Sequence, residues 1–401
     1  MESEHWTGPW RRAAAVTKTT EITRTAGVVF FVAFVLCAAF VTQPSARAAQ
    51  ASQAAPRATS WPQFRGSPQM TGVAVSDVPQ ALSLKWTYQA GETIESSAAI
   101  ADGVVFVGSG DGDLLAIDLE TGKLKWKYAT GNPIGESSPA VSGGLVYIGD
   151  LGGIVHAVHT SDGSKAWTFR TGGEVKSSPA IAGDLVLIGS YDTHLYAFDA
   201  KTGAVKWKLQ TDGPVHSTAA VQNGIVYLGS CDERFRAIRL ADGHVLFTIP
   251  VSYTAASTVM DGTRAYVGTF DNELLGIDVQ TKKILWRFKD PQREFPYYSS
   301  AALAAGRVIV GNRDKSVHAI DAATGKEAWK FTTRARVDSS PAIAGGRVFV
   351  GSSDGRLYVL DAQTGHKIWD YDVGDALTAS PAVASGRVVI GAQDGKLYCF
   401  G

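Results

Sequence analysis

Tryptophan recurs about every forty residues through most of this 401-residue chain. The spacing is interrupted once, and Phe247 occupies the middle of that interval. A period of about 20 to 50 residues indicates a repeat architecture, in which each repeat buries its apolar faces against its neighbours. This period limits the possible folds more than any other feature. The repeated tryptophans are Trp86, Trp126, Trp167, Trp207, Trp286, Trp329 and Trp369.

Each repeat contains four short stretches with the residue types of β-strands. The clearest copy, residues 339–375, reads SSPAIAGGRVFVGSSDGRLYVLDAQTGHKIWDYDVGD. Its β-branched and aromatic runs are typical of strands. The dipeptides GG, DG and TG that separate these runs are typical of tight turns. We therefore expect each repeat to form a four-stranded antiparallel meander.

The number of repeats predicts an eight-bladed, all-β propeller over residues 82–401. The last repeat stops after its third strand, at LYCFG, and the missing tryptophan strand stands before the first repeat, at LSLKWTYQ around Trp86. A closed ring explains both features, because the Trp86 strand then completes the last blade and removes an exposed sheet edge. An open solenoid would need polar caps, and none is visible. The pairs that begin the eight first strands are Ser96-Ser97, Ser137-Ser138, Ser177-Ser178, Ser217-Thr218, Ala255-Ala256, Ser299-Ser300, Ser339-Ser340 and Ala379-Ser380.

The repeated polar and aromatic residues are expected to support the fold. One aspartate per repeat stands at the hairpin between the second and third strands, and another begins a D-x-x-T-G turn, where a short side chain can bond its own backbone. The tryptophans are expected to pack as wedges between neighbouring blades. The hairpin aspartates are Asp111, Asp192, Asp232, Asp271, Asp314, Asp354 and Asp394, and the turn aspartates are Asp118, Asp199, Asp278, Asp321 and Asp361.

The first sixty residues predict export. Residues 26–41 form an uncharged apolar run that follows several basic residues and precedes the sequence Ala46-Arg47-Ala48. This pattern predicts that residues 1–48 are a secretory signal peptide, with an uncleaved N-terminal membrane anchor at residues 26–41 as the alternative. Residues 49–60 then form a disordered linker, because they lack an apolar period, and residues 61–81 form an N-terminal extension of the propeller. Both alternatives place the remainder of the chain in the periplasm or outside the cell.

Composition and motifs exclude several functional classes. Lys and Arg together number 38, as do Asp and Glu, so the chain lacks the basic excess of a nucleic-acid-binding protein. Cysteines at positions 37, 231 and 399 have neither disulfide-scaffold nor zinc-site spacing. The sequence contains no G-x-S-x-G, H-E-x-x-H or phosphate-loop motif. No catalytic residue and no metal ligand is therefore assigned.

Two repeats, AIDLETGKLKW at residues 116–126 and AFDAKTGAVKW at residues 197–207, resemble the PQQ-type propeller repeat. The WPQFRG sequence at residues 61–66 is also similar to the start of secreted bacterial PQQ-like propellers. The resemblance implies one of two classes. Quinoprotein dehydrogenases would bind PQQ and Ca²⁺ and use a catalytic Asp, whereas the BamB-like group is non-enzymatic and supports outer-membrane protein assembly. This chain lacks the vicinal cysteines and long insertions of the dehydrogenases.

The candidate binding residues lie where the repeats differ. The residue before each innermost strand varies in charge and size, and together these residues should form a ring around the mouth of the central channel. Acidic members of the ring have oxygen ligands suited to Ca²⁺, but the ring also contains Lys176 and His216, which favour a solvated, ion-paired funnel. The mouth ring is Glu95, Glu136, Lys176, His216, Thr254, Tyr298, Asp338 and Thr378. The hairpin position before each turn aspartate varies as well: Gly110, Tyr191, Cys231, Phe270, Arg313, Ser353 and Gln393.

The connection into the sixth blade, KDPQREFPYYSS at residues 289–300, is longer than its counterparts. It contains Arg293, Phe295 and Tyr297, residue types that dominate protein interfaces. We interpret this loop as a candidate contact surface, with a self-packed loop held by its prolines as the alternative.

The sequence therefore predicts a monomeric, exported propeller that acts without a cofactor as a binding or assembly scaffold for an envelope protein or polypeptide. The alternative is a PQQ-dependent alcohol or sugar dehydrogenase with Ca²⁺ at the mouth.

Overall fold

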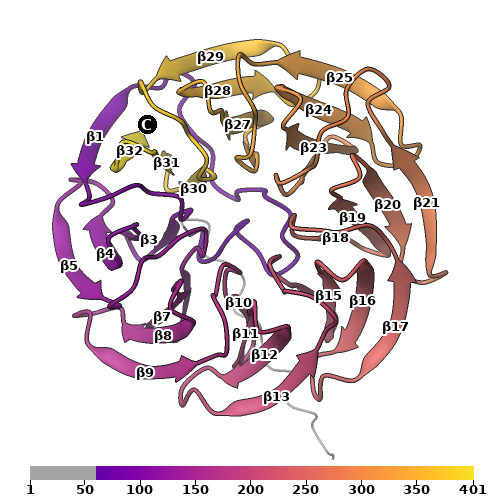
Figure 1. The fold of residues 1–401 in the computed structure, drawn as a ribbon. Coiled ribbons are helices and arrows are strands. Elements are labelled where there is room, and N and C mark those ends of the chain that lie inside the picture. The colour runs from indigo at the N-terminus through magenta and orange to yellow at the C-terminus, as the bar shows by residue number, and fades with distance from the viewer. Residues whose placement is uncertain (1–59) are drawn as a thin grey trace, which may run out of the picture. The chain divides into compact units, whose positions relative to one another are not determined.

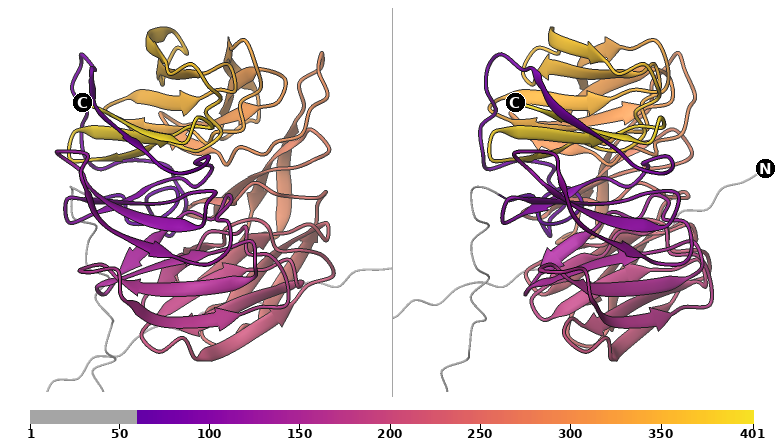
Figure 2. Two further views of the ribbon diagram at one scale, coloured as in Figure 1. Left: turned by 60° about the vertical axis from the view of Figure 1, so that its left-hand side comes forward. Right: turned by 90° about the vertical axis from the view of Figure 1, so that its left-hand side faces the viewer.

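A computed structural model describes residues 60–401, and in this range the chain forms 32 strands in eight four-stranded antiparallel sheets. The sheets are arranged as blades around a central channel, which confirms the predicted eight-bladed propeller (Figure 1). Figure 2 shows the blades from the side as twisted sheets that follow one another around the ring. The predicted signal peptide or anchor and nearly all of the predicted linker lie outside the described residues.

In each of the first seven blades the strands run outward from the channel in chain order. Blade 1 contains β2 (Ala99–Ala101), β3 (Val104–Gly108), β4 (Asp113–Asp118) and β5 (Leu124–Ala129). Blade 2 contains β6 (Ala140–Ser142), β7 (Leu145–Gly149), β8 (Ile154–His159) and β9 (Lys165–Arg170). Blade 3 contains β10 (Ala180–Ala182), β11 (Leu185–Gly189), β12 (His194–Asp199) and β13 (Val205–Gln210). Blade 4 contains β14 (Ala220–Gln222), β15 (Ile225–Gly229), β16 (Arg234–Arg239) and β17 (Val245–Pro250).

The second half of the ring repeats this arrangement. Blade 5 contains β18 (Val259–Asp261), β19 (Arg264–Gly268), β20 (Leu274–Asp278) and β21 (Lys283–Phe288). Blade 6 contains β22 (Ala302–Ala304), β23 (Arg307–Asn312), β24 (Ser316–Asp321) and β25 (Glu327–Thr332). Blade 7 contains β26 (Ala342–Ala344), β27 (Arg347–Gly351), β28 (Arg356–Asp361) and β29 (Lys367–Asp372). Blade 8 combines β30 (Ala382–Ala384), β31 (Arg387–Gly391) and β32 (Lys396–Phe400) with β1 (Leu84–Gln89).

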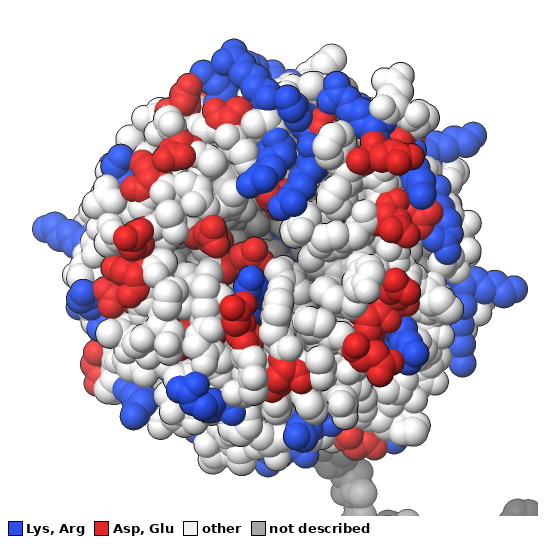
Figure 3. Space-filling view, in the orientation of Figure 1, with Lys and Arg blue, Asp and Glu red and all other residues white. Residues whose placement is uncertain are grey.

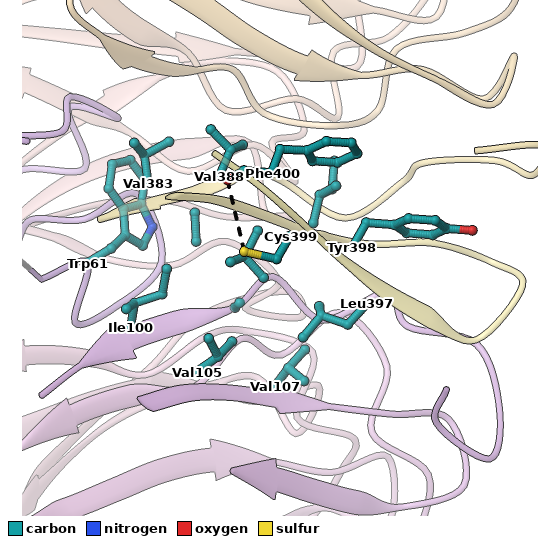
Figure 4. Packing of buried hydrophobic residues seen from close by; sticks show 14 of the residues in the cluster. Trp61, Ile100, Val105, Val107, Val383, Val388, Leu397, Tyr398, Cys399 and Phe400 are labelled. Carbon is teal, nitrogen blue, oxygen red and sulfur yellow. Dashed lines mark hydrogen bonds between the residues drawn. The ribbon is translucent and has the colours of Figure 1, made fainter. Parts of the chain in front are cut away.

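The ring closes through blade 8, as the sequence predicts. Strand β1 pairs antiparallel with β32 and places Trp86 opposite Cys399. Backbone hydrogen bonds between Ser83 and Gly401 extend this pairing in both directions, at 3.2 and 3.1 Å. A core cluster shared by blades 7, 8 and 1 lies beside this junction (Figure 4). The two ends of the propeller sequence are thus joined by a sheet and by a common core.

Each repeated tryptophan, except the last, connects its blade to the next one. The indole N–H of Trp167 donates to the carbonyl of Ala200 at 2.9 Å, and that of Trp207 donates to Leu240 at 2.8 Å. A glycine in the turn between the third and fourth strands of the next blade lies directly on the indole ring, so a methyl group on Gly243 would come within 2.7 Å of Trp207. These contacts confirm the predicted wedges.

A ring of hydrogen bonds around the channel connects all eight blades. The second residue of each predicted Ser-Ser pair, or its equivalent, offers a side-chain oxygen to the backbone N–H of the corresponding residue in the preceding blade, at 2.9 to 3.2 Å. The ring closes where the Ser380 amide donates to Ser97. Because these groups are buried, each bond satisfies an amide that would otherwise lack an acceptor. The members are Ser97, Ser138, Ser178, Thr218, Ser257, Ser300, Ser340 and Ser380.

The N-terminal extension lies inside the ring. Innermost strands leave one edge of backbone groups unpaired toward the channel, and exposed edges of this kind readily accept another chain segment. Residues 61–74 use that edge, bonding to the innermost strands of blades 1 to 7. Arg65 is buried and donates to the carbonyl of Ala301 at 2.7 Å, and burial lowers its pKa to about 9. The extension thereby crosses the end of the channel opposite the hairpins.

The repeated aspartates organise turns, as predicted. Asp199 accepts hydrogen bonds from the backbone N–H and the hydroxyl of Thr202, at 3.0 and 2.9 Å, and the hydroxyl bond is the main cause of its lowered pKa. Asp192 accepts one from the backbone N–H of His194 in its own hairpin and one from Gly172 in the neighbouring connection. The two described cysteines, Cys231 and Cys399, are free thiols.

Within residues 60–401, no helix has the length and apolar character needed to cross a membrane.

Replacing Ser178 with alanine should lower the free energy of unfolding by about 1 to 3 kcal/mol, because the buried Ser138 amide loses its acceptor. Threonine should retain most of the stability, since Thr218 fills the same position in blade 4. Urea unfolding measures both effects. Ser161→Ala, in an exposed turn, is the control and should change stability by less than about 0.5 kcal/mol. Equal losses in the two alanine variants would contradict a stabilising hydrogen-bond ring.

Gly243→Ala should destabilise the chain more than Gly224→Ala. Both glycines have a φ of +73°, so alanine costs about 1 to 2 kcal/mol of backbone strain at either site. A methyl group at Gly224 meets nothing within 4 Å, whereas at Gly243 it clashes with Trp207. The difference between the two unfolding free energies therefore measures the indole contact alone, and equal values would count against it.

Candidate functional site

The mouth of the channel is the face that carries the connections into the innermost strands and the hairpins between second and third strands. A hollow with a volume of about 200 Å³ lies at its centre (Figure 3). Phe64 from the N-terminal extension also lines it. The structure brings seven of the eight predicted ring residues together there: Glu95, Glu136, Lys176, His216, Tyr298, Asp338 and Thr378.

Glu136 and His216 are in contact across the mouth. The Glu136 carboxylate lies 2.9 Å from Nε2 of His216, and the hydroxyl of Tyr191 lies 2.7 Å from Nδ1. Burial pulls the pKa of Glu136 upward, but the hydrogen bond and charge of His216, followed by the charges of Lys176 and Arg313, outweigh it and lower the pKa. Glu136 is therefore ionised and already paired within the protein.

Asp338 is held by two arginines on another side of the mouth. Arg313 contacts both carboxylate oxygens, at 2.7 and 3.1 Å, and Arg336 approaches the second oxygen at 3.1 Å. The Arg313 guanidinium also lies 3.4 Å from the ring centre of Tyr298, which in turn packs against Phe270 at 4.8 Å. Burial lowers the pKa of Arg313, but its bond to Asp338 outweighs this effect and raises the pKa overall.

Glu95 bonds to a neutral side chain, that of Gln393. The amide nitrogen of Gln393 lies 3.2 Å from the Glu95 carboxylate and 2.8 Å from the hydroxyl of Thr378. Gln393 occupies the variable hairpin position of blade 8, as Tyr191 and Arg313 do in their own blades. Hairpin residues from one blade thus contact ring residues of the next, a pairing that the sequence did not predict.

Thr254 was wrongly assigned to the mouth ring. The hydrogen-bond ring shows that Ser257, and not Ala256, is the blade 5 equivalent of Ser97. The residue that faces the mouth is therefore Ala255, which lines the hollow. Thr254 is buried, and its backbone N–H donates to the backbone carbonyl of Ser230. Val215 makes the equivalent bond to the carbonyl of Ser190 one blade earlier, so Thr254 is the counterpart of the buried Val215. The two alanines before Ser257 concealed this one-residue shift in the sequence.

Tyr297 is a core residue and not part of an exposed contact loop. Its side chain is 1% exposed and packs on Gly268. Val215 packs on Gly189 in the same way, so the two residues occupy equivalent positions in different repeats. Arg293 donates to the backbone carbonyl of Asp314 at 2.6 Å and so anchors the loop. Of the three predicted loop candidates, Phe295 has the exposed apolar side chain, with 44% exposure.

A buried ionic network beneath this loop was missed by the sequence analysis. His318 lies 3.1 Å from Asp314 and 2.7 Å from Glu327, and Lys330 bonds to Asp290 and lies 3.2 Å from Asp314. Burial lowers the pKa of His318, but its two carboxylate partners outweigh burial and raise the pKa. Asp290, Asp314 and His318 have ligand atoms within 4.8 Å of one another. The ammonium group of Lys330 already supplies a cation there.

The residues at the mouth do not fit the Ca²⁺ and PQQ that the dehydrogenase alternative implies. Ca²⁺ takes six to eight oxygen ligands, but Glu95, Glu136 and Asp338 are held by separate partners. The hollow of about 200 Å³ is also smaller than most ligand sites, which span about 300 to 1,000 Å³. The mouth therefore lacks a converging ligand set.

The family model described as outer membrane protein assembly factor BamB matches four overlapping stretches, residues 74–168, 130–254, 214–304 and 284–400. No curated protein matches the sequence. BamB from Moraxella catarrhalis is similar in structure, with a TM-score of 0.70, 19% identity, and coverage of 80% of this chain and 99% of that one. Quinohemoprotein alcohol dehydrogenase from Comamonas testosteroni has a TM-score of 0.73 and 16% identity, covering 85% and 80%. The computationally designed Ika8 protein has a TM-score of 0.69 and 20% identity, covering 78% and 96%.

The structural similarities, all at low identity, show a shared fold and do not separate a scaffold from a dehydrogenase. The family model is more specific, because its matched stretches together span nearly the whole propeller. The chain therefore belongs to the family described as outer membrane protein assembly factor BamB.

Proposed function

We propose that this chain is an exported, non-enzymatic propeller that binds a polypeptide partner of the cell envelope at its mouth face. The observation that carries the proposal is that two of the carboxylates at the centre of the mouth, those of Glu136 and Asp338, are held by basic side chains of the protein. Glu136 pairs with His216, and Asp338 pairs with Arg313 and Arg336. Groups held in this way position a surface for recognition, whereas an acid–base site needs a group free to exchange a proton with its substrate.

Exposed aromatic side chains on this face support binding of a protein partner. Tyr253 is 49% exposed on the connection into blade 5, and Phe295 is 44% exposed on the connection into blade 6. The packed pair Phe270 and Tyr298 belongs to the same two blades. Aromatic residues and arginine are enriched at the centres of protein interfaces, and this sector of the mouth contains both.

The family assignment and the N-terminal sequence support the location and the role. The family is described by its function in outer-membrane protein assembly, and the apolar segment at residues 26–41 has the features of an export signal. We also propose that the propeller acts as a monomer and without a cofactor; the separate pairing of the mouth carboxylates supports the second part of this proposal. We therefore place the protein in the periplasm or outside the cell, with an assembly complex as its setting.

A photoreactive benzoylphenylalanine at position 295 or 253 of the full chain should form a light-dependent adduct with an envelope protein in intact cells. Both positions should yield the same partner by mass spectrometry, because they lie on adjacent connections of one face. Position 201 is the control, since Lys201 lies in an exposed turn at the opposite end of the strands. Adducts from position 201 alone, or none from positions 253 and 295, would refute the proposed binding face.

PQQ and Ca²⁺ together should leave the thermal unfolding of the purified chain unchanged and support no dye reduction with alcohols or sugars. A ligand at about 100 times its Kd stabilises a folded protein by about 2.7 kcal/mol, a change that calorimetry detects easily. Stabilisation that requires both compounds, together with substrate-dependent dye reduction, would favour the dehydrogenase alternative.

A further inference from the structure

The mouth face is electrically asymmetric. Lys and Arg gather beside the hollow above blades 6 and 7, whereas Asp and Glu gather beside it over blades 1 and 2 (Figure 3). On the basic side, Arg313 and Arg336 share the single carboxylate of Asp338, so this group has a surplus positive charge. On the acidic side, Glu95 bonds to the neutral amide of Gln393 and makes no ion pair within residues 60–401. The asymmetry therefore results from charges that the protein does not neutralise internally.

A groove extends outward from the basic side of the hollow. It has a volume of about 580 Å³, within the range of ligand sites, and its lining includes Lys315, Arg336, Ser353, Thr378 and Gln393. Glu95 lies in the same lining and is its acidic member. The groove thus offers hydroxyl and amide groups in addition to two cations.

Three groups in this groove have unused binding capacity. Lys315 is exposed and makes no ion pair with any residue in the range 60–401. The Arg336 side chain is 53% exposed although it contacts Asp338. The hydroxyl oxygen of Ser353 is buried and has no hydrogen-bond partner among the described residues. A ligand with several acceptor oxygens would satisfy all three groups.

We propose that this groove, formed by Lys315, Arg336, Ser353, Thr378 and Gln393, binds an acidic segment of the polypeptide partner. The proposal rests on the function proposed above and specifies the chemistry of its ligand. Carboxylates of the segment pair with Lys315 and Arg336, and the neighbouring aromatic sector accepts its apolar residues. Glu95 repels an acidic segment that is shifted toward blade 1. The charge asymmetry therefore also keeps the segment on the basic side of the mouth.

Two observations favour a peptide ligand over a small anion. The groove is continuous with the wider mouth, because Glu95, Arg336 and Thr378 line both. Exposed Phe295 and Tyr253 lie on the same face and would have no role in holding a small anion. Inorganic phosphate is nevertheless a useful competitor, because it tests the alternative directly.

The test uses the full purified chain and a fluorescein-labelled peptide of alternating Glu, Phe and Gly, compared with the same peptide carrying Gln in place of Glu. Anisotropy should show at least about fivefold weaker binding of the Gln peptide, and the double variant Lys315→Gln/Arg336→Gln should weaken binding of the Glu peptide by about five- to tenfold. The affinity for the Glu peptide should also fall as salt is raised. Phosphate at equal ionic strength should compete no better than chloride.

The matched control is Lys123→Gln/Lys201→Gln, which removes the same charge from exposed turns at the opposite end of the strands and should leave binding unchanged. Equal binding of the two peptides would overturn the acidic specificity but leave polypeptide binding intact. Equal losses in the groove and control variants, or specific competition by phosphate, would also overturn the inference. Failure of both peptides to bind, together with no adduct at position 295, would instead reject the proposed function itself.

Discussion

The pairing of β1 with β32 is the constraint on which the rest of the structure depends. Each blade packs mainly against its two neighbours, so eight blades in a row would leave two unprotected faces and a three-stranded last blade. Residues from the start of the propeller supply the missing strand, and the hydrogen bond from Ser380 to Ser97 closes the ring around the channel. Closure also brings together connections that are hundreds of residues apart, and the mouth exists only because they converge.

Two consecutive positions before each innermost strand have different roles, because the first packs inside the fold and the second faces the channel. Val215, Thr254 and Tyr297 occupy one repeated position, and each is buried against a glycine at the end of the second strand of the preceding blade. The next residue faces the channel, where His216, Ala255 and Tyr298 differ in charge and size. A propeller can therefore vary one ring of side chains while the packing beneath it stays nearly constant, which makes this fold suitable for many different ligands.

The chemistry of the mouth favours recognition. Glu136 and Asp338 at its centre are held by histidine or arginine partners, and the extension crosses the opposite end of the channel. Rigid, internally paired charges keep a fixed shape, so less ordering is required when a partner binds. The surplus charges lie to one side, and long-range attraction from such an asymmetric surface orients an approaching partner before contact.

The sequence alone determined the architecture of this protein. Strand composition, turn dipeptides and the forty-residue period are local signals, and they were sufficient for the eight blades, the role of Trp86, the turn aspartates and the tryptophan wedges. Most of the mouth ring followed from the same period. The period did not predict that Ala255 faces the mouth in place of Thr254, or that Tyr297 is buried. Connecting loops differ in length and carry no periodic pattern.

Only the tertiary structure decided how side chains from different blades meet. Glu136 and His216 lie two blades apart, and Arg313 reaches Asp338 in the next blade. No local sequence pattern encodes these contacts between side chains of different blades. The sequence likewise identified residues 61–81 only as an extension. The path of residues 61–74 inside the ring is set by the unpaired edges of the innermost strands, which exist only after the blades have assembled.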